Sequence, residues 1–170
     1  RFSRKIHTLR LSADYGTGPL TGPAAVLIPA FRESAVIGTT IAHALAVWPQ
    51  RELRIYVGCY RNDPATVAAA MAGAGGDARV RVVVHGAAGP TTKADCLNRL
   101  YRALCDDEQR QGRKFRSVVL HDSEDMVHPA GLQAIDAALG AVDFVQLPVS
   151  PGLLPHSRWI SGHYADEFTE

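Results

Sequence analysis

The chain alternates between short, continuous apolar runs and longer stretches in which apolar residues recur every three or four positions. Continuous apolar runs of about four to eight residues are typical of strands that are covered on both faces. The longer periodic stretches predict helices with one apolar face. The predicted strands are residues 24–30, 53–59, 79–85, 117–120 and 142–149.

Capping residues and prolines mark where the predicted helices begin. Ser34 is expected to cap the first helix. Asp63 followed by Pro64 has the form of a helix start, and Thr92 with Asp95 has the spacing of a capping box. The predicted helices are residues 34–47, 64–72, 92–105 and 129–140.

Strands that alternate with helices at this spacing predict an α/β fold, a Rossmann-like three-layer α/β/α arrangement with a mainly parallel sheet. Residues 1–23 lack periodicity and are rich in Gly and Pro, so we expect an arm there. Residues 24–150 form the predicted α/β domain, and residues 151–170 begin a further segment. The chain starts without Met and stops within a polar stretch, so we expect it to be a piece of a longer protein.

Composition narrows the classes of protein to consider. The formal net charge of +1 over 170 residues gives no bulk attraction to nucleic acid. The three cysteines, Cys59, Cys96 and Cys105, lack metal-type spacing, and their odd number fits a reducing compartment. No apolar run approaches the ~18 residues of a membrane span. The basic opening, residues 1–5, fits a solvated chain end better than a flank beside a membrane.

Three carboxylates gather in the stretch from His121 to Pro129, directly after a buried strand. In an open α/β sheet, ligands bind at the carboxyl ends of the strands. Residues two apart in extended chain project to the same side, so Asp122 and Glu124 can reach one cation. Carboxylate oxygens suit Mg²⁺ or Mn²⁺, which take one or two carboxylates together with substrate phosphates. Asp125 is expected only to support the turn and to cap the next helix.

Other interpretations of this stretch remain open. A solvated acidic turn is the structural alternative, and His121 with His128 could indicate zinc, although their spacing matches no standard zinc pattern. A phosphotransfer receiver also needs acids at strand ends. Here the first strand ends in Pro29 and Ala30, where a receiver would place acids.

Lys93 and Glu33 are two further candidates. Lys93 follows the Gly/Pro loop of residues 86–92 at a predicted helix N-terminus, where backbone N–H groups and the helix dipole favour an anion. The loop is not a P-loop, because no Gly directly precedes the lysine, and a surface lysine is the simpler interpretation of Lys93 alone. Glu33 could bind a ligand or favour the start of a helix.

Taken in order, these segments resemble a family 2 glycosyltransferase. The resemblance lies in AVLIPAFRES (residues 25–34), GPTTKADCLN (89–98) and VVLHDSEDMVHP (118–129), the last corresponding to the family's DxD-type metal motif. Two later matches, FVQLPV (144–149) and SGHYADEF (161–168), narrow it to a bacterial inner-membrane group. That group includes phage adsorption protein B and is related to the cellulose synthases.

The resemblance implies a GT-A fold that binds a nucleotide-diphosphate sugar, usually a UDP-sugar, together with Mg²⁺ or Mn²⁺. It implies that Asp122 contacts the ribose or the metal and that Glu124 is the principal metal ligand. Lys93 would lie near the nucleotide or the diphosphate. The residues expected to line the nucleotide pocket after the first strand are Pro29, Ala30 and Glu33.

The chain departs from the family pattern in three places. Cys59 and Tyr60 stand where the family commonly has an acidic pair that reads uracil, and Asn62 or Asp63 is the expected substitute. Glu replaces Asp at position 124, which keeps the charge. The acceptor-side catalytic base is expected beyond the end of the chain, with Asp166 and Glu167 as weak candidates inside it.

The predicted function is donor binding in a metal-dependent, inverting glycosyltransferase with an unknown acceptor. The resemblance places the full-length protein at the cytoplasmic face of the bacterial inner membrane, tethered to it. The alternative is a catalytically inactive module of the same fold that serves binding or assembly in an envelope complex.

Overall fold

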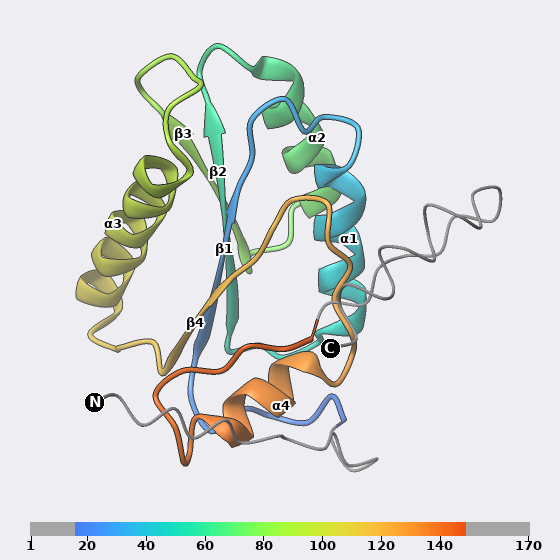
Figure 1. Ribbon diagram of the computed structural model, residues 1–170, viewed down its shortest axis with the longest axis vertical. Helices are drawn as coiled ribbons and strands as arrows, with labels where there is room; N and C mark the ends of the chain where they lie inside the picture. The colour runs from blue at the N-terminus through green and yellow to red at the C-terminus, as the bar shows by residue number, and fades with distance from the viewer. Residues whose placement is uncertain (1–15, 149–170) are drawn as a thin grey trace, which may run out of the picture.

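The fold is an α/β/α sandwich around a four-stranded parallel sheet, seen in a computed structural model that describes residues 16–148 (Figure 1). The strands lie in the order β3-β2-β1-β4. The predicted three-layer, parallel arrangement is therefore confirmed. The elements are β1 (Ala24–Pro29), α1 (Ile37–Val47), β2 (Leu53–Tyr60), α2 (Pro64–Ala74), β3 (Val80–His85), α3 (Lys93–Gln111), β4 (Ser117–Leu120) and α4 (Gly131–Ala138).

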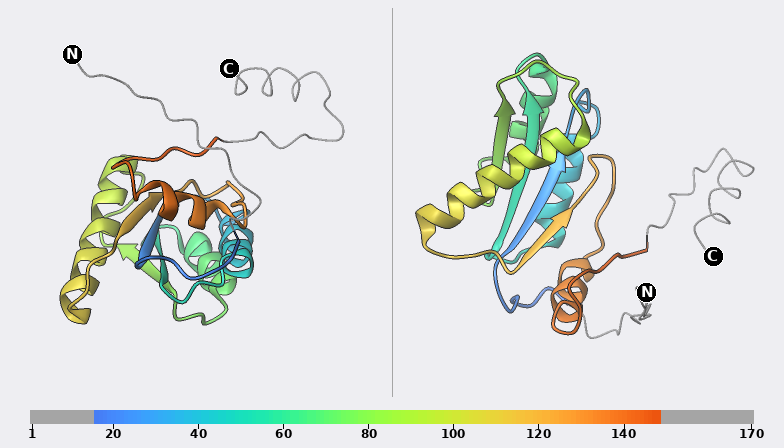
Figure 2. Two further views of the ribbon diagram at one scale, coloured as in Figure 1. Left: turned by 90° about the horizontal axis from the view of Figure 1, so that it is seen from below. Right: turned by 60° about the vertical axis from the view of Figure 1, so that its left-hand side comes forward.

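The two faces of the sheet carry separate apolar clusters, because successive side chains of a strand point to opposite sides. Val26 and Ile28 of β1 face α1 and α2, whereas Ala25 and Leu27 face α3. Figure 2 shows α3 alone on one side of the sheet, with α1 and α2 on the other. These strands are buried on both faces, which explains why they read as continuous apolar runs.

The predicted helix caps at Asp63 and Thr92 are confirmed. The Asp63 carboxylate accepts from the N–H of Thr66 at the start of α2, and the Thr92 hydroxyl accepts from the N–H of Asp95 at the start of α3. The α3 helix runs six residues past its predicted end at residue 105 and stops at Gly112, which adopts the left-handed conformation (φ 62°).

The predicted cap at Ser34 is wrong. The α1 helix begins at Ile37, and no side chain caps it. Residues 34–36 form a turn instead, in which the carbonyl of Glu33 accepts from the N–H groups of Val36 and Ile37. This backbone turn already satisfies the donors that Ser34 was expected to satisfy.

The predicted fifth strand is also wrong over residues 142–148, and residue 149 lies outside the described part of the chain. These residues form no ladder with the sheet. The preceding α4 lies at the amino ends of the strands, where Asp136 accepts from Thr21 before β1 and from Arg116 before β4. The segment continues there, with Leu147 packed 3.6 Å from the position a Cβ would take on Gly131.

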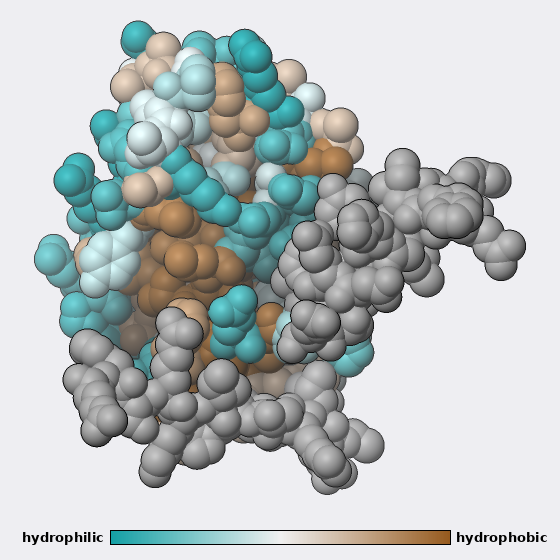
Figure 3. All heavy atoms as spheres, in the orientation of Figure 1, coloured by the Kyte–Doolittle hydropathy of each residue, from teal (hydrophilic) through white to brown (hydrophobic). Residues whose placement is uncertain are grey.

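The face of β4 turned toward α3 is only partly covered by the described residues. Val118 pairs with Ala25 and Leu120 with Leu27, so both point to the α3 side, yet they are 44% and 65% exposed. Figure 3 shows apolar side chains gathered between α3 and β4. In residues 16–148, no helix has the length and apolar character needed to cross a membrane.

Two glycines allow α1 and α2 to pack in backbone contact. A Cβ on Gly73 would lie 2.3 Å from the Gly38 carbonyl oxygen and 2.7 Å from the Gly38 Cα. Backbone atoms of a packed helix cannot rotate away as a side chain can. The separation of the two helices therefore depends on Gly at both positions.

We predict that Gly73→Ala lowers the free energy of unfolding by about 1–3 kcal/mol, the usual cost of overpacking, although Ala is the better helix former by about 1 kcal/mol. Urea denaturation measures the change. Gly86→Ala is the matched control, because a Cβ on Gly86 meets no atom within 4 Å. Equal midpoints for the two variants would contradict a close helix contact.

Candidate functional site

The candidate site lies at the carboxyl ends of β1 and β4. From β1 the chain moves to β2 on one side, and from β3 it returns to β4 on the other side of β1. This reversal between neighbouring strands is the topological switch point at which open α/β sheets bind ligands. Residues 30–36 and 121–130, which follow the two strands, meet at this edge (Figure 1).

Lys93 and Asp122, both singled out from the sequence, are in contact at this edge. The ammonium of Lys93, the first residue of α3, pairs with the carboxylate of Asp122. Asp122 is placed by its neighbour His121, whose N–H donates to Leu27 of β1. The side chains are 60% and 47% exposed. An exposed pair of this kind is worth about 1 kcal/mol or less, so a ligand can exchange for either partner.

Glu124 and Asp125 occupy different positions in the loop after β4. Glu124 is exposed, and its carboxylate accepts from the Ser123 hydroxyl at 3.0 Å. The N–H of Asp125 donates to the Asp122 carbonyl at 3.4 Å, a main-chain bond within the turn. A supporting role of the Asp125 carboxylate in this turn stays a prediction. Its expected role as a helix cap is wrong, because the N-cap of α4 is Ala130, and no side chain caps this helix.

The predicted ligands Asp122 and Glu124 would suit a cation that a substrate also binds better than a site built from protein ligands alone. Within residues 16–148, no group of three or more His, Cys, Asp or Glu side chains could hold a metal ion. His128 Nδ1 accepts from the N–H of Ala130, so this ring nitrogen is engaged with the main chain. Asp122 is the predicted ligand that contacts Lys93, and Mg²⁺ or Mn²⁺ binding by Asp122 and Glu124 stays a prediction.

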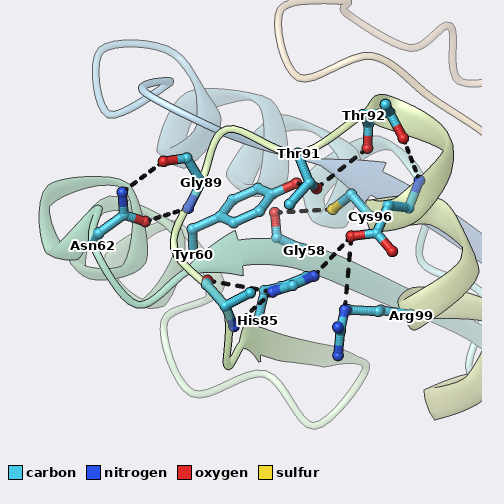
Figure 4. A network of polar contacts seen from close by, with 11 residues as sticks. Gly58, Tyr60, Asn62, His85, Gly89, Thr91, Thr92, Cys96 and Arg99 are labelled. Carbon is cyan, nitrogen blue, oxygen red and sulfur yellow. Dashed lines mark hydrogen bonds and ion pairs between the residues drawn. The ribbon is translucent and has the colours of Figure 1, made fainter.

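A polar network that the sequence did not predict lies at the ends of β2 and β3 (Figure 4). The Tyr60 ring stacks on the buried His85 ring, with centroids 5.0 Å apart, and the Tyr60 hydroxyl meets the Thr91 hydroxyl at 2.6 Å. The N–H of Ala87 donates to His85 Nδ1, so Nε2 carries the proton and donates to Asp95 at 3.0 Å. This hydrogen bond from His85 lowers the pKa of the Asp95 carboxyl.

Neutral side chains stand at the end of β2, where the family commonly has an acidic pair. Cys59 is buried, and burial raises the pKa of its thiol to about 12, so the thiol stays neutral. Burial also raises the pKa of Tyr60, whose hydroxyl is engaged with Thr91. The Asn62 side chain donates to the Gly89 carbonyl and accepts from the Gly89 N–H, which ties residues 86–92 to the end of β2.

Asp63 joins the loops that follow β1 and β2. One carboxylate oxygen accepts from the N–H of Thr66, and the other accepts from the N–H of Arg32 at 2.5 Å. Arg32 has a positive φ of 61°, which is uncommon for a residue other than Gly. Burial raises the pKa of Asp63, but the hydrogen bonds from Thr66 and Arg32 outweigh it and leave the pKa below its usual value.

The other predicted pocket residues follow β1. Pro29 ends the strand, and Ala30 is buried with its N–H donating to the Gly58 carbonyl. Glu33 is held by its main chain, since its N–H donates to the Thr66 hydroxyl. Their contact with a nucleotide stays a prediction. Asp166 and Glu167 lie outside the described residues, as does the whole segment 151–170.

The sequence profile of the glycosyltransferase-like family 2 matches residues 22–170, most of the chain. The chain belongs to this family. Its family 2 glycosyltransferase domain is 34% identical over 148 residues to bacteriophage adsorption protein B of Escherichia coli K12 and, to the same extent, to bacteriophage N4 adsorption protein B of Escherichia coli O157:H7. The resemblance seen in the sequence motifs is confirmed.

These alignments cover 87% of this family 2 chain but only 20% of each relative, so the chain spans about a fifth of their length. The names of the relatives refer to phage adsorption and are silent on activity. No solved structure matches the chain significantly. Membership of a glycosyltransferase family does not favour the alternative of an inactive assembly module.

We predict that Asp63→Asn lowers the free energy of unfolding at pH 7 by about 1–3 kcal/mol, the usual cost of an unsatisfied buried group. The amide oxygen of Asn can still cap Thr66, but its NH₂ group cannot accept from the N–H of Arg32. Because folding lowers the pKa of Asp63, the ionised carboxyl stabilises the fold above its unfolded pKa of about 4. This contribution is lost as the pH falls through the folded pKa. Denaturation at pH 7 and pH 3 should therefore show the difference between wild type and variant shrinking in acid.

Asp106→Asn, on the exposed side of α3, is the control for this change and should stay within about 0.5 kcal/mol of wild type at both pH values. A deficit for Asp63→Asn that is equal at pH 3 and pH 7 would show that the charge of Asp63 is not involved.

Proposed function

We propose that this chain is the donor-binding part of an inverting, metal-dependent glycosyltransferase that takes its sugar from a nucleotide-diphosphate sugar. The observation that supports this most directly is the contact between Lys93 and Asp122. It brings a cationic and an anionic group from segments 29 residues apart to the switch point of the sheet. The family membership of the chain supports the transferase chemistry.

The start of α3 supplies the group that would hold the diphosphate. Lys93 is the first residue of a 19-residue helix, whose N-terminal N–H groups and dipole favour an anion. Its exposed ammonium is paired only at the surface with Asp122. In the proposed complex, Lys93 turns from this carboxylate to a phosphate oxygen, which leaves Asp122 free for a cation.

Asp122 and Glu124 are the residues that would hold Mg²⁺ or Mn²⁺. A cation bound there would stabilise negative charge on the departing diphosphate. In the inverting reaction, a carboxylate deprotonates an acceptor hydroxyl, whose oxygen then attacks the anomeric carbon from the face opposite the diphosphate. The carboxylate base is proposed to lie on the acceptor side, where Asp166 and Glu167 are the weak candidates within this chain.

Uridine is the proposed base of the donor, on the strength of the family resemblance alone. Asp63 remains the proposed residue near the base, although both of its oxygens accept backbone hydrogen bonds. The full-length protein is proposed to be tethered at the cytoplasmic face of the bacterial inner membrane.

We predict that Glu124→Ala lowers the rate of sugar-nucleotide hydrolysis by the full-length protein by about 100-fold or more, because the charge on the leaving diphosphate loses its stabilisation. Mn²⁺ affinity, measured by electron paramagnetic resonance of the free ion, should fall with it. Asp125→Asn is the matched control, since it changes a neighbouring acid that is assigned only to the turn. Activity that survives Glu124→Ala would refute the assigned metal role.

We predict opposite effects of Lys93→Gln on two ligands. The affinity for Mn²⁺ alone should rise by up to about five-fold, because an exposed ion pair with a competing ammonium is removed. The affinity for a nucleoside diphosphate should fall by about ten-fold, because a charge-assisted hydrogen bond is lost. Calorimetric titration measures both constants.

Lys114→Gln is the control for charge, since Lys114 pairs with Glu108 near the other end of α3 and should leave both affinities unchanged. A fall in both affinities for Lys93→Gln would show that the lysine does not compete with the metal for Asp122.

A further inference from the structure

The loop after β4, residues 121–130, is hydrogen-bonded near both of its ends to side chains of α1 and of the residue after it, about 80 residues earlier in the chain. Three side chains, two from α1 and one from Trp48 directly after it, each donate a hydrogen bond to a different main-chain carbonyl of the loop. These bonds run from Thr40 Oγ1 to Ser123 at 2.6 Å, from His43 Nε2 to Val127 at 2.9 Å and from Trp48 Nε1 to His128 at 3.0 Å.

Thr40 and Trp48 carry buried polar atoms. The Thr40 hydroxyl also lies 3.2 Å from the Val36 carbonyl of its own helix, as is common for a helical Thr, but its shorter contact is with Ser123. Both side chains are 3% exposed. Thr40 lies on the buried face of α1 with Ile37 and Ile41, and Trp48, which follows the helix, belongs to the same apolar cluster. Apolar side chains of similar size would pack equally well at these positions. What such residues would lack is a donor for the loop, and a buried carbonyl without a donor is costly.

Thr40 is connected to Glu124 through one intermediate residue. Ser123, which separates the two acids, is 4% exposed and gives its carbonyl to Thr40. Its hydroxyl donates to the Glu124 carboxylate at 3.0 Å. The middle residue of the acidic motif therefore faces inward to α1, and the acid that follows it is exposed.

We infer that α1 is the positioning element of the acidic loop. Thr40, acting through Ser123, sets the place of Glu124, while His43 and Trp48 hold the far end of the loop. Thr40 and Ser123 are positioning residues, since they act on the proposed metal ligand through hydrogen bonds. This inference rests on the proposed function, in which Glu124 binds a divalent cation.

The test compares Thr40→Val, which keeps the shape of the side chain but removes its hydroxyl, with Thr40→Ser, which keeps the hydroxyl. Mn²⁺ affinity of the full chain is measured by electron paramagnetic resonance, with a nucleoside diphosphate present. Thr40→Val should weaken Mn²⁺ binding by about ten-fold, the lower end of the effect typical of groups that orient metal ligands. Thr40→Ser should bind Mn²⁺ within about two-fold of wild type, because it keeps the hydroxyl that orients the loop.

Thr39→Val is the matched control, because the same substitution falls on the exposed neighbour of Thr40 and should leave Mn²⁺ affinity unchanged. Ser123→Ala removes only the hydroxyl that meets Glu124 and should weaken Mn²⁺ binding as Thr40→Val does. It also serves as the second variant if Thr40→Val proves unstable. Equal Mn²⁺ affinities for wild type, Thr40→Val and Ser123→Ala would overturn the inference.

Amide hydrogen exchange without metal provides a second measurement. Thr40→Val should speed exchange in residues 121–130 while the amides of β1 and β2 keep their protection; uniformly faster exchange would indicate general destabilisation and overturn the inference. If wild type binds Mn²⁺ and Thr40→Val binds it equally well, only the positioning role fails. If wild type binds no Mn²⁺ even with the nucleoside diphosphate, the proposed function fails and the positioning role fails with it.

Discussion

The central strand β1 constrains the rest of the structure, because it hydrogen-bonds to β2 on one edge and to β4 on the other. Five of its six residues are buried, so both of its faces are covered as well. A strand enclosed in this way has no room for an exposed functional side chain. The polar groups of the site must therefore come from the segments that follow the strands, at the carboxyl edge of the sheet.

Helix α1 links the two loops that meet at this edge. Residues 30–36 lead into α1. Main-chain N–H groups of this segment donate to the side chains of Asp63, which caps α2, and of Thr66 in α2. Two side chains of α1, together with that of Trp48 directly after it, then anchor residues 121–130. Because α1 also packs on α2 through Gly38 and Gly73, a shift of either helix would displace residues 121–130 as well. The geometry of the site is thus a property of several packed elements together.

The end of β2 is stabilised by contacts with the end of β3 and with the loop that follows β3. With Cys59 and Tyr60 in place of an acidic pair, the strand end is neutral and largely apolar. Tyr60 stacks on His85, and residues 86–92 are brought in by Thr91 and Asn62. These contacts order the loop that leads into Lys93. Cys59 and Tyr60 contribute no carboxylate to this edge, and the contacts of Tyr60 and Asn62 with residues 86–92 support the start of α3.

Much of the fold could be predicted from the sequence because its strongest signals are local. Buried strands require continuous apolar runs, and the caps at Asp63 and Thr92 act within three residues, so both can be recognised without tertiary information. Asp122 and Lys93 could be chosen as candidates for the same reason, since a charge at a strand end or a helix start is visible in the local sequence.

Contacts that depend on tertiary structure decided where local sequence patterns were misleading or gave no partner. The segment 142–148 has the pattern of a strand but forms none, because α4 carries the chain to the amino ends of the sheet, away from a partner. Ser34 has the chemistry of a cap, but a backbone turn satisfies the same donors. The roles of Thr40 and Trp48 depend on a loop about 80 residues away, and a polar residue on an apolar stripe was their only sign in the sequence. Hydrogen bonds between segments so far apart exist only after the chain has folded, so the sequence can mark the residues involved without naming their partners.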